Sequence, residues 1–170
     1  MPVVFTSASS SPVPGDWGFI AFSNSSTDAE FDDEGNYLSG SILEYCVIEY
    51  AGGSTYNFGT VITDNALPYI FRCIIHDNNA SGIYGINLSG TLRIRQSLIT
   101  DNEAPTGGGI NVWGGYVIIE GNTIMGNNAL SSYGGGGIFA TSNTTEIINN
   151  LIEGNTSIGY GAGGGGGGIY

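Results

Sequence analysis

Basic residues are nearly absent from this chain. Its 170 residues include 3 basic side chains, all of them arginine, against 15 acidic ones, which gives a formal net charge of −12. Such a charge repels both the phosphate backbone of nucleic acids and anionic lipid surfaces, so we expect neither as a partner. An acidic polysaccharide would need a local basic patch, for which three arginines are a poor basis. Cations are the more natural small partners.

Long apolar segments are also missing. Because no run of 18 apolar residues occurs, the sequence predicts no segment that inserts into a membrane. Charged residues make up 11% of the chain and 30 residues are glycine, a profile that could indicate disorder. However, 41% of the residues are hydrophobic and the isoleucines are regularly spaced. We therefore predict one folded domain over residues 1–170.

The isoleucines belong to an internal repeat. The pattern I-x-x-x-x-I-x-x-N occurs four times after a degenerate first copy, and successive copies start 24 to 28 residues apart. The copies cover residues 43–51, 70–78, 94–102, 119–127 and 147–155. A second motif, glycine followed by isoleucine, recurs in the same phase at Gly85, Gly109, Gly137 and Gly168. Two motifs that keep phase indicate a solenoid.

Short strands at this period predict an all-β parallel β-helix of about six rungs. Each strand is too short to bury its apolar side alone, but stacked copies pair at about 4.8 Å and enclose aliphatic columns. The N-terminal part fits the same phase. Residues 3–6 are predicted as a first-motif strand, with Val4 at the first isoleucine position, and residues 17–20 as a second-motif strand. An insertion follows at about residues 23–37.

Four asparagines close the first motif in consecutive copies. Asn78, Asn102, Asn127 and Asn155 are expected at the same bend. Stacked asparagines hydrogen-bond along the stack through their amides, and asparagine tolerates the left-handed backbone that a bend requires. The sequence therefore predicts a buried asparagine ladder.

The two cysteines, Cys46 and Cys73, occupy the same position in neighbouring copies. Parallel strands at about 4.8 Å bring two α-carbons within the range of a disulfide. A pair of buried thiols fits the same position, so the sequence leaves both states open.

The insertion is strongly acidic and is a candidate calcium site, because calcium prefers several carboxylate and carbonyl oxygens. Its spacing departs from that of an EF-hand loop, since Gly35 is the eighth residue rather than the sixth and no glutamate stands at the twelfth. A solvated surface loop is the alternative. The candidate ligands are Asp28, Glu30, Asp32, Asp33 and Glu34.

The glycine–isoleucine strands, the form I-x-N-N-x-I-x-x-N at residues 147–155 and the N-terminal segment at residues 3–18 resemble the right-handed parallel β-helix repeat family. This family includes pectate-lyase-like enzymes and repetitive regions of large surface proteins, and the sequence looks like the surface-protein branch. The resemblance implies a right-handed helix and an extracellular or cell-surface location. It implies no particular activity, because this fold carries many functions.

Candidate catalytic residues are not convincingly arranged. Asp77 and Asp101 share a column and could act as paired carboxylates, but their turn positions explain them more simply. The single histidine, His76, is expected on the surface between Glu49 and Thr100 of its column, and no partner for a metal or base role is evident. The arginines lie away from the acidic insertion, and Arg95 is expected to pair with Glu120 of the next rung. The sequence therefore favours a non-enzymatic role.

Three aromatic residues are candidate carbohydrate contacts. Trp113, Phe139 and Tyr170 belong to the outer side of the second-motif strands, and aromatic rings stack on sugars. Scattered exposed aromatics are the alternative. A carbohydrate-binding module is therefore one alternative function, and a β-helical polysaccharide lyase or hydrolase is another.

No amphipathic helix caps either end of the predicted solenoid, and the two ends are close in phase. We expect a structural or adhesive β-solenoid that stacks head to tail into a filament or is a fragment of a longer surface protein. The expected partners are a second copy or the continuing solenoid, and glycans. No cofactor is expected besides the candidate calcium ion. The residues expected at the junction are Val3, Val4, Phe5, Ile147, Ile152 and Ile169.

Overall fold

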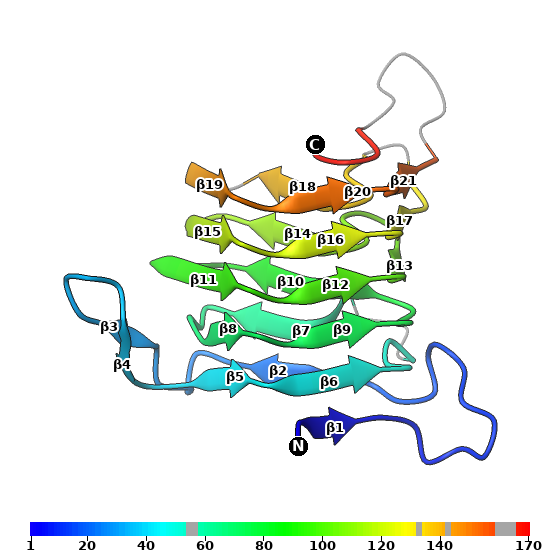
Figure 1. Cartoon of the computed structure of the whole chain (residues 1–170), viewed down its shortest axis with the longest axis horizontal. Helices are drawn as coiled ribbons and strands as arrows, with labels where there is room; N and C mark the ends of the chain where they lie inside the picture. Colours follow the sequence, from blue (N-terminus) through cyan, green and yellow to red (C-terminus); the bar gives the residue numbers. More distant parts are fainter. Residues whose placement is uncertain (54–57, 132–133, 142–143, 159–165) are drawn as a thin grey trace.

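Parallel β-strands form the walls of the molecule (Figure 1). The computed structural model describes residues 1–53, 58–131, 134–141, 144–158 and 166–170, and the regular structure in this part of the chain is strand only. These residues include no helix that is long and apolar enough to cross a membrane. The fold is an all-β parallel β-solenoid, as predicted.

Three long sheets run along the solenoid axis. The first sheet contains β1 (Val3–Phe5), β6 (Cys46–Glu49), β9 (Ile74–His76), β12 (Leu98–Thr100), β16 (Thr123–Met125) and β20 (Leu151–Glu153). The second sheet contains β5 (Ile42–Glu44), β8 (Tyr69–Phe71), β11 (Thr91–Arg95), β15 (Tyr116–Glu120) and β19 (Thr144–Ile148). The third sheet contains β2 (Ile20–Phe22), β7 (Gly59–Asp64), β10 (Ser81–Ile86), β14 (Ile110–Trp113) and β18 (Ile138–Thr141).

Each turn of the solenoid visits the second, the first and then the third sheet. The complete turns are β5–β6–β7, β8–β9–β10, β11–β12–β14 and β15–β16–β18, so the number of complete turns is smaller than the predicted count of about six rungs. Incomplete turns, β1–β2 and β19–β20, lie at the two ends. A small sheet of β13 (Glu103–Ala104), β17 (Asn128–Ala129) and β21 (Thr156–Ser157) lines one corner.

The interior is filled by aliphatic columns, one behind each long sheet. The column of the first sheet is Phe5, Ile48, Ile75, Ile99, Ile124 and Ile152, paired in register. The column of the second sheet is Leu43, Ile70, Ile94, Ile119 and Ile147. Most of these side chains are fully buried, and β-branched residues suit a pleated wall of this kind. The two predicted isoleucine columns are confirmed.

The N-terminal strand joins a different sheet from the one predicted. Val4 pairs with Val47 rather than aligning with Leu43, and Phe5 pairs with Ile48. The side chain of Phe5 packs against the core, whereas Val4 is exposed. Phe5 rather than Val4 therefore faces the interior, and spacing alone could not show this.

The register predicted for the third sheet is also wrong. Ile83, not Ile86, pairs with Ile110 and lies in the interior column. The chain then takes a wider bend, in which Asn87 has a positive φ of 55° and Leu88 turns back into the core. The motif at Gly85 therefore marks the end of strand β10 rather than its inward position.

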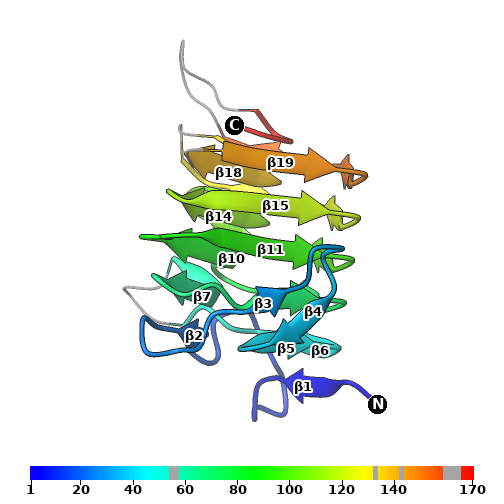
Figure 2. The ribbon, with the colours of Figure 1, turned by 90° about the vertical axis from the view of Figure 1, so that its left-hand side faces the viewer.

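The acidic insertion forms an antiparallel hairpin, β3 (Glu30–Phe31) and β4 (Tyr37–Ser39), beside the lower part of the second sheet (Figure 2). The ring of Phe31 packs edge-on against Tyr69 of the wall, with centroids 5.1 Å apart, and Tyr37 stacks on Tyr69 at 6.0 Å. The guanidinium of Arg93 lies 4.5 Å from the centre of the Phe31 ring, so the expectation that the arginines lie away from the insertion is wrong for Arg93. Aromatic contacts therefore hold this insertion to the solenoid.

Candidate functional site

Two bends flank each of the strands β6, β9, β12, β16 and β20 of the first sheet, and each bend contains one residue with left-handed backbone, with φ between 50° and 66°. Before the strand these residues are Tyr45, Arg72, Gln96, Gly121 and Asn149. After the strand they are Tyr50, Asp77, Asp101, Gly126 and Gly154. The residue that follows each of them is buried in every complete turn. Each bend thus pairs an outer position with an inner one, and the inner positions form two ladders.

The predicted asparagine ladder occupies the bend after the first sheet. The Nδ2 atom of Asn78 donates to Oδ1 of Asn102 at 2.8 Å, and that of Asn102 donates to Oδ1 of Asn127 at 3.0 Å. The same donors bond backbone carbonyls, and Asn127 continues the ladder to Asn155 at 2.9 Å. Asn78, Asn102 and Asn127 are buried, whereas Asn155 in the last turn is half-buried.

A second ladder occupies the bend before the first sheet, and sequence reasoning missed it. Ser97 donates its backbone N–H to Oδ1 of Asn122 at 2.9 Å, and Asn122 donates both its backbone N–H and its amide to Oδ1 of Asn150. Cys73 donates its backbone N–H to Oγ of Ser97 at 3.1 Å. The signal that could have revealed this ladder is the recurrence of small polar residues, Ser97, Asn122 and Asn150, at the repeat position of the two cysteines.

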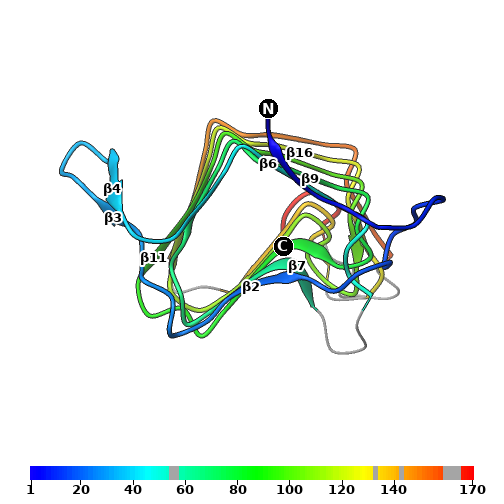
Figure 3. The same ribbon diagram turned by 90° about the horizontal axis from the view of Figure 1, so that it is seen from below.

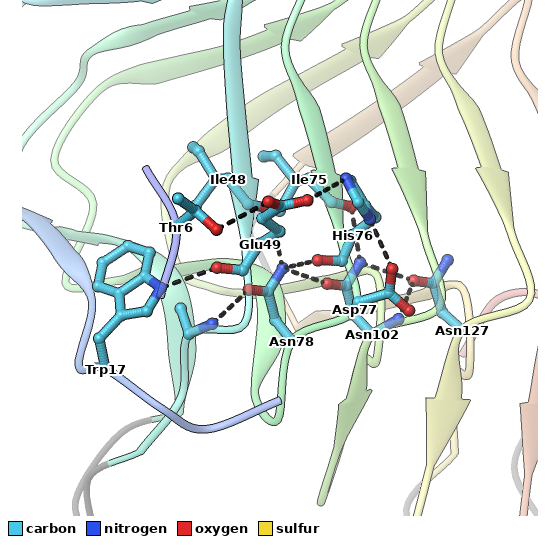
Figure 4. A network of polar contacts seen from close by, with 11 residues as sticks. Thr6, Trp17, Ile48, Glu49, Ile75, His76, Asp77, Asn78, Asn102 and Asn127 are labelled. Atoms are coloured by element: carbon cyan, nitrogen blue, oxygen red, sulfur yellow. Dashed lines mark hydrogen bonds and ion pairs between the residues drawn. The ribbon is translucent and has the colours of Figure 1, made fainter. Parts of the chain in front are cut away.

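The outer side of the bend after the first sheet carries a polar network (Figure 4). The imidazole of His76 lies between two carboxylates, with Nε2 3.1 Å from Oε2 of Glu49 and Nδ1 2.7 Å from Oδ2 of Asp77. Thr6 donates to Oε1 of Glu49 at 2.8 Å, and the indole N–H of Trp17 donates to the Glu49 carbonyl at 2.7 Å. The predicted column position of His76 beside Glu49 is confirmed, whereas the expectation that it has no partners is wrong.

Glutamate, histidine and aspartate are residue types used in general acid–base catalysis. Here the side chains of Glu49 and His76 are 21% and 24% exposed, and both imidazole nitrogens contact carboxylates of the protein. Thr6 and Trp17 belong to the N-terminal segment, whereas Glu49 and His76 belong to consecutive turns. The arrangement thus fastens the N-terminal segment to the wall of the solenoid.

The carboxylates proposed as calcium ligands do not converge. Asp28 accepts a hydrogen bond from the backbone of Leu67 at 2.8 Å, and Glu30 accepts one from Ser39 at 2.9 Å. The carboxylate of Asp32 accepts two hydrogen bonds from Asn36, which lower its pKa. Asp33 and Glu34 lie in the exposed turn of the hairpin. In the part of the chain that the structure describes, no group of three or more histidine, cysteine, aspartate or glutamate side chains is arranged to hold a metal ion.

The three aromatic residues proposed as carbohydrate contacts form one stack. The rings of Trp113 and Phe139 are 5.1 Å apart, and Tyr170 stacks almost parallel to Phe139 at 5.4 Å. Phe139 is only 3% exposed, so Trp113 and Tyr170 alone offer ring surface to a ligand. The indole N–H of Trp113 donates to Asn111 at 2.7 Å.

Cys46 and Cys73 are free, buried thiols in adjacent turns. The Cys73 thiol donates to the Leu43 carbonyl at 3.3 Å and that of Cys46 to the Glu44 carbonyl at 3.3 Å. Burial raises the pKa of both thiols, that of Cys73 to about 12. Of the two states left open by the sequence, the structure has the reduced one.

The arginines lie on or beside the second sheet. Arg95 pairs with Glu120 of the next turn at 2.5 Å, which confirms the predicted contact. Arg72 lies at the bend between the second and first sheets, where its guanidinium is 4.6 Å from the centre of the Phe71 ring. Because both side chains of the Arg95 pair are partly exposed, it contributes under about 1 kcal/mol to stability.

Stacked strands, aliphatic columns and polar ladders define the class of this protein as a parallel β-solenoid. The model of the right-handed β-helix region matches residues 22–124, which is more than half of the chain, so the chain belongs to the right-handed β-helix family. This membership also gives the hand of the solenoid. Searches of curated proteins and of solved structures gave no match.

Proposed function

We propose that this chain is a non-enzymatic structural solenoid of an extracellular or cell-surface assembly, and that a further β-helical turn covers its terminal turns. The observation that carries the proposal is the open edge at each end. Among the described residues, β1 pairs with β6 alone, β19 with β15 alone and β20 with β16 alone. Unpaired strand edges are templates for another strand.

Apolar side chains accompany these open edges. Val3 is 57% exposed, Ile147 is 37% exposed, and Ile169, which bridges to Ile138, is 47% exposed. Phe5 and Ile152 end the column of the first sheet and are half-buried. Each such side chain contributes roughly 1.5–3 kcal/mol when fully buried, before the cost of association. Val4 lies on the outer face, so it does not belong to the interior of this junction.

Two occupants fit these ends: a second copy stacked head to tail, which builds a filament, or the continuing solenoid of a longer parent. In a head-to-tail stack, Phe5 of one copy continues the column that ends at Ile152 of the next. Both arrangements use the same strand edges and the same buried side chains.

The test uses two neighbouring isoleucines as a matched pair. Ile147 continues an interior column, whereas Ile148 lies on the outer face opposite Glu120, and their exposures are 37% and 36%. Light scattering over increasing concentration and electron microscopy should show stacks of the wild type. Ile147→Lys should dissociate them, and Ile148→Lys should not. If the wild type stays a monodisperse monomer, self-stacking is wrong and the continuing solenoid is the occupant.

Glycan binding is a second candidate function, favoured by the exposed rings of Trp113 and Tyr170, which are 41% and 51% exposed. Trp113→Ala should lower retention on insoluble polysaccharide, because a stacking surface is lost. Phe19→Ala is the control, since Phe19 is 43% exposed elsewhere. Equal retention of the two variants would contradict a role for this aromatic stack.

A further inference from the structure

The outer face of the first sheet carries a column along the solenoid that is aliphatic except for Thr123. Its members, paired in register through all six strands, are Val4, Val47, Ile74, Leu98, Thr123 and Leu151. Val4, Ile74 and Leu151 are 51%, 39% and 51% exposed. Figure 3 shows this sheet as a nearly straight side of the cross-section. A straight row of exposed aliphatic side chains on a flat sheet marks a contact surface.

The two edges of this face differ in charge. At the bend before the strands, Arg72 donates to Gln96 at 3.0 Å and also contacts the hydroxyl of Tyr45. At the bend after the strands lie Asp77 and Asp101. Arg72 and Asp77 flank the same strand, β9, while Gln96 and Asp101 flank β12. At these two strands one edge therefore presents donors and the other presents carboxylates, whereas the bends that flank β16 are formed by Gly121 and Gly126.

We propose that this face packs against the same face of a second copy of the chain, with the two solenoids side by side and parallel. A two-fold axis parallel to the solenoids places each edge opposite the other edge of the second copy, at the same turn. Arg72 then meets Asp77 of the second copy, and Gln96 meets its Asp101.

An antiparallel arrangement of the two copies brings the acidic edges together, and like charges repel. The charge pattern thus selects the parallel arrangement, while the aliphatic column supplies the buried surface. This contact uses a sheet face rather than strand edges, so it is independent of the end-to-end pairing proposed above.

The size of the face sets the strength of the contact. Six strands at about 4.8 Å and about four residues at about 3.3 Å give a face of about 380 Å². A standard interface buries about 800 Å² on each partner, so the isolated dimer is weak. Wherever copies stack along the axis, the face repeats and the contacts of successive copies add. The lateral contact therefore matches an assembly of long solenoids better than a free pair of chains.

Charge exchange tests the proposal. Sedimentation equilibrium at up to millimolar concentration, in the Ile147→Lys background that blocks end-to-end stacking, should show a dimer. Arg72→Asp and Asp77→Arg should each weaken it by about tenfold, because the two-fold axis repeats the pair. The double variant should restore it. Both positions have left-handed backbone, with φ of 52° and 53°, which already accommodates arginine and aspartate in this chain.

Three results would overturn the proposal: no dimer at millimolar concentration, single variants that associate like the parent, or a double variant no better than the singles. Folding of every variant is checked by circular dichroism and thermal unfolding. A fold-disrupting effect of either substitution would persist in the double variant, whereas lost charge complementarity would not.

Cross-linking tests the parallel orientation. Two Leu151→Cys chains should be joined by a short bifunctional maleimide, because a parallel dimer places the two positions at the same end. Leu38 on the hairpin is 61% exposed in the wild type, and two Leu38→Cys chains should not be joined by the same reagent. A dimer without this Leu151→Cys product would overturn the parallel arrangement. Head-to-tail stacking does not mimic the result, since it places Leu151 beside Val4 of the next copy.

Discussion

At the scale of single residues, left-handed positions decide where the chain turns. The position after the first sheet is occupied by Tyr50, Asp77, Asp101, Gly126 and Gly154. Glycine has no Cβ to clash there, and aspartate can bond its local backbone. This requirement accounts for Asp77 and Asp101 without any paired-carboxylate chemistry, and it leaves both at the edge of the outer face.

The asparagine ladder leads to the first prediction. Asn102→Ala should lower the free energy of unfolding by about 1–3 kcal/mol, because Asn78 and the Ile75 carbonyl lose buried hydrogen-bond partners. Asn79→Ala is the matched control, since Asn79 is exposed beside the same ladder. Urea unfolding measures both variants, and equal losses would contradict the structural role of the ladder.

The thiols predict a dependence of stability on pH. Burial raises the pKa of Cys73 from 9.0 to about 12, so the folded state favours the neutral thiol. Its contribution is fully present below pH 9 and is lost as pH rises toward 12. Over this range, the wild type should lose stability more steeply than Cys73→Ala. Parallel curves in chemical unfolding would contradict this, and the comparison removes the shared effect of the buried tyrosines.

At the scale of elements, the β3–β4 hairpin shows that an acidic segment can be positioned by its aromatic residues. Phe31 and Tyr37 contact Tyr69 and Arg93, which lie far along the chain. The carboxylates accept hydrogen bonds from neighbouring groups instead of gathering around one point.

Phe31→Ala should therefore free the hairpin and raise its rate of proteolytic cleavage by about tenfold, because local opening becomes easier. Leu38→Ala is the control on the same hairpin, since Leu38 is 61% exposed. A chelator should leave the melting temperature of the wild type unchanged. A chelator-induced decrease would instead support the calcium site.

The sequence was sufficient to predict the stacked strands that form the walls of the fold, but it was insufficient to predict the register of every strand. Isoleucines at fixed intervals predicted the columns, because only stacked copies can bury them. The position of Ile83 was missed, since an extra bend after β10 changes the spacing without changing the motif. The repeat places Glu49 beside His76 in one column, but the contact between their side chains depends on conformations that the repeat does not specify. The contacts of Phe31 arise across the fold and cannot be deduced from nearby residues.

At the scale of the whole molecule, inward and outward positions alternate on every wall. Ile75 is fully buried, whereas its neighbour Ile74 is 39% exposed. Ile75→Ala should lower the free energy of unfolding by about 2–5 kcal/mol, because it leaves a cavity in the column. Ile74→Ala should cost less than about 1 kcal/mol in dilute solution. Denaturant unfolding compares them, and similar costs would contradict the assigned faces.

Within the described parts of the chain, the strands of each turn pair only with strands of the turns above and below, apart from the small hairpin. A pulling force along the axis would therefore load one ladder of hydrogen bonds at a time, like a zipper, rather than the whole body at once. Under tension the chain would lengthen in steps of one turn, each step dissipating work while the remaining turns stay folded. An assembly built from such solenoids would yield gradually under load instead of breaking at a single point.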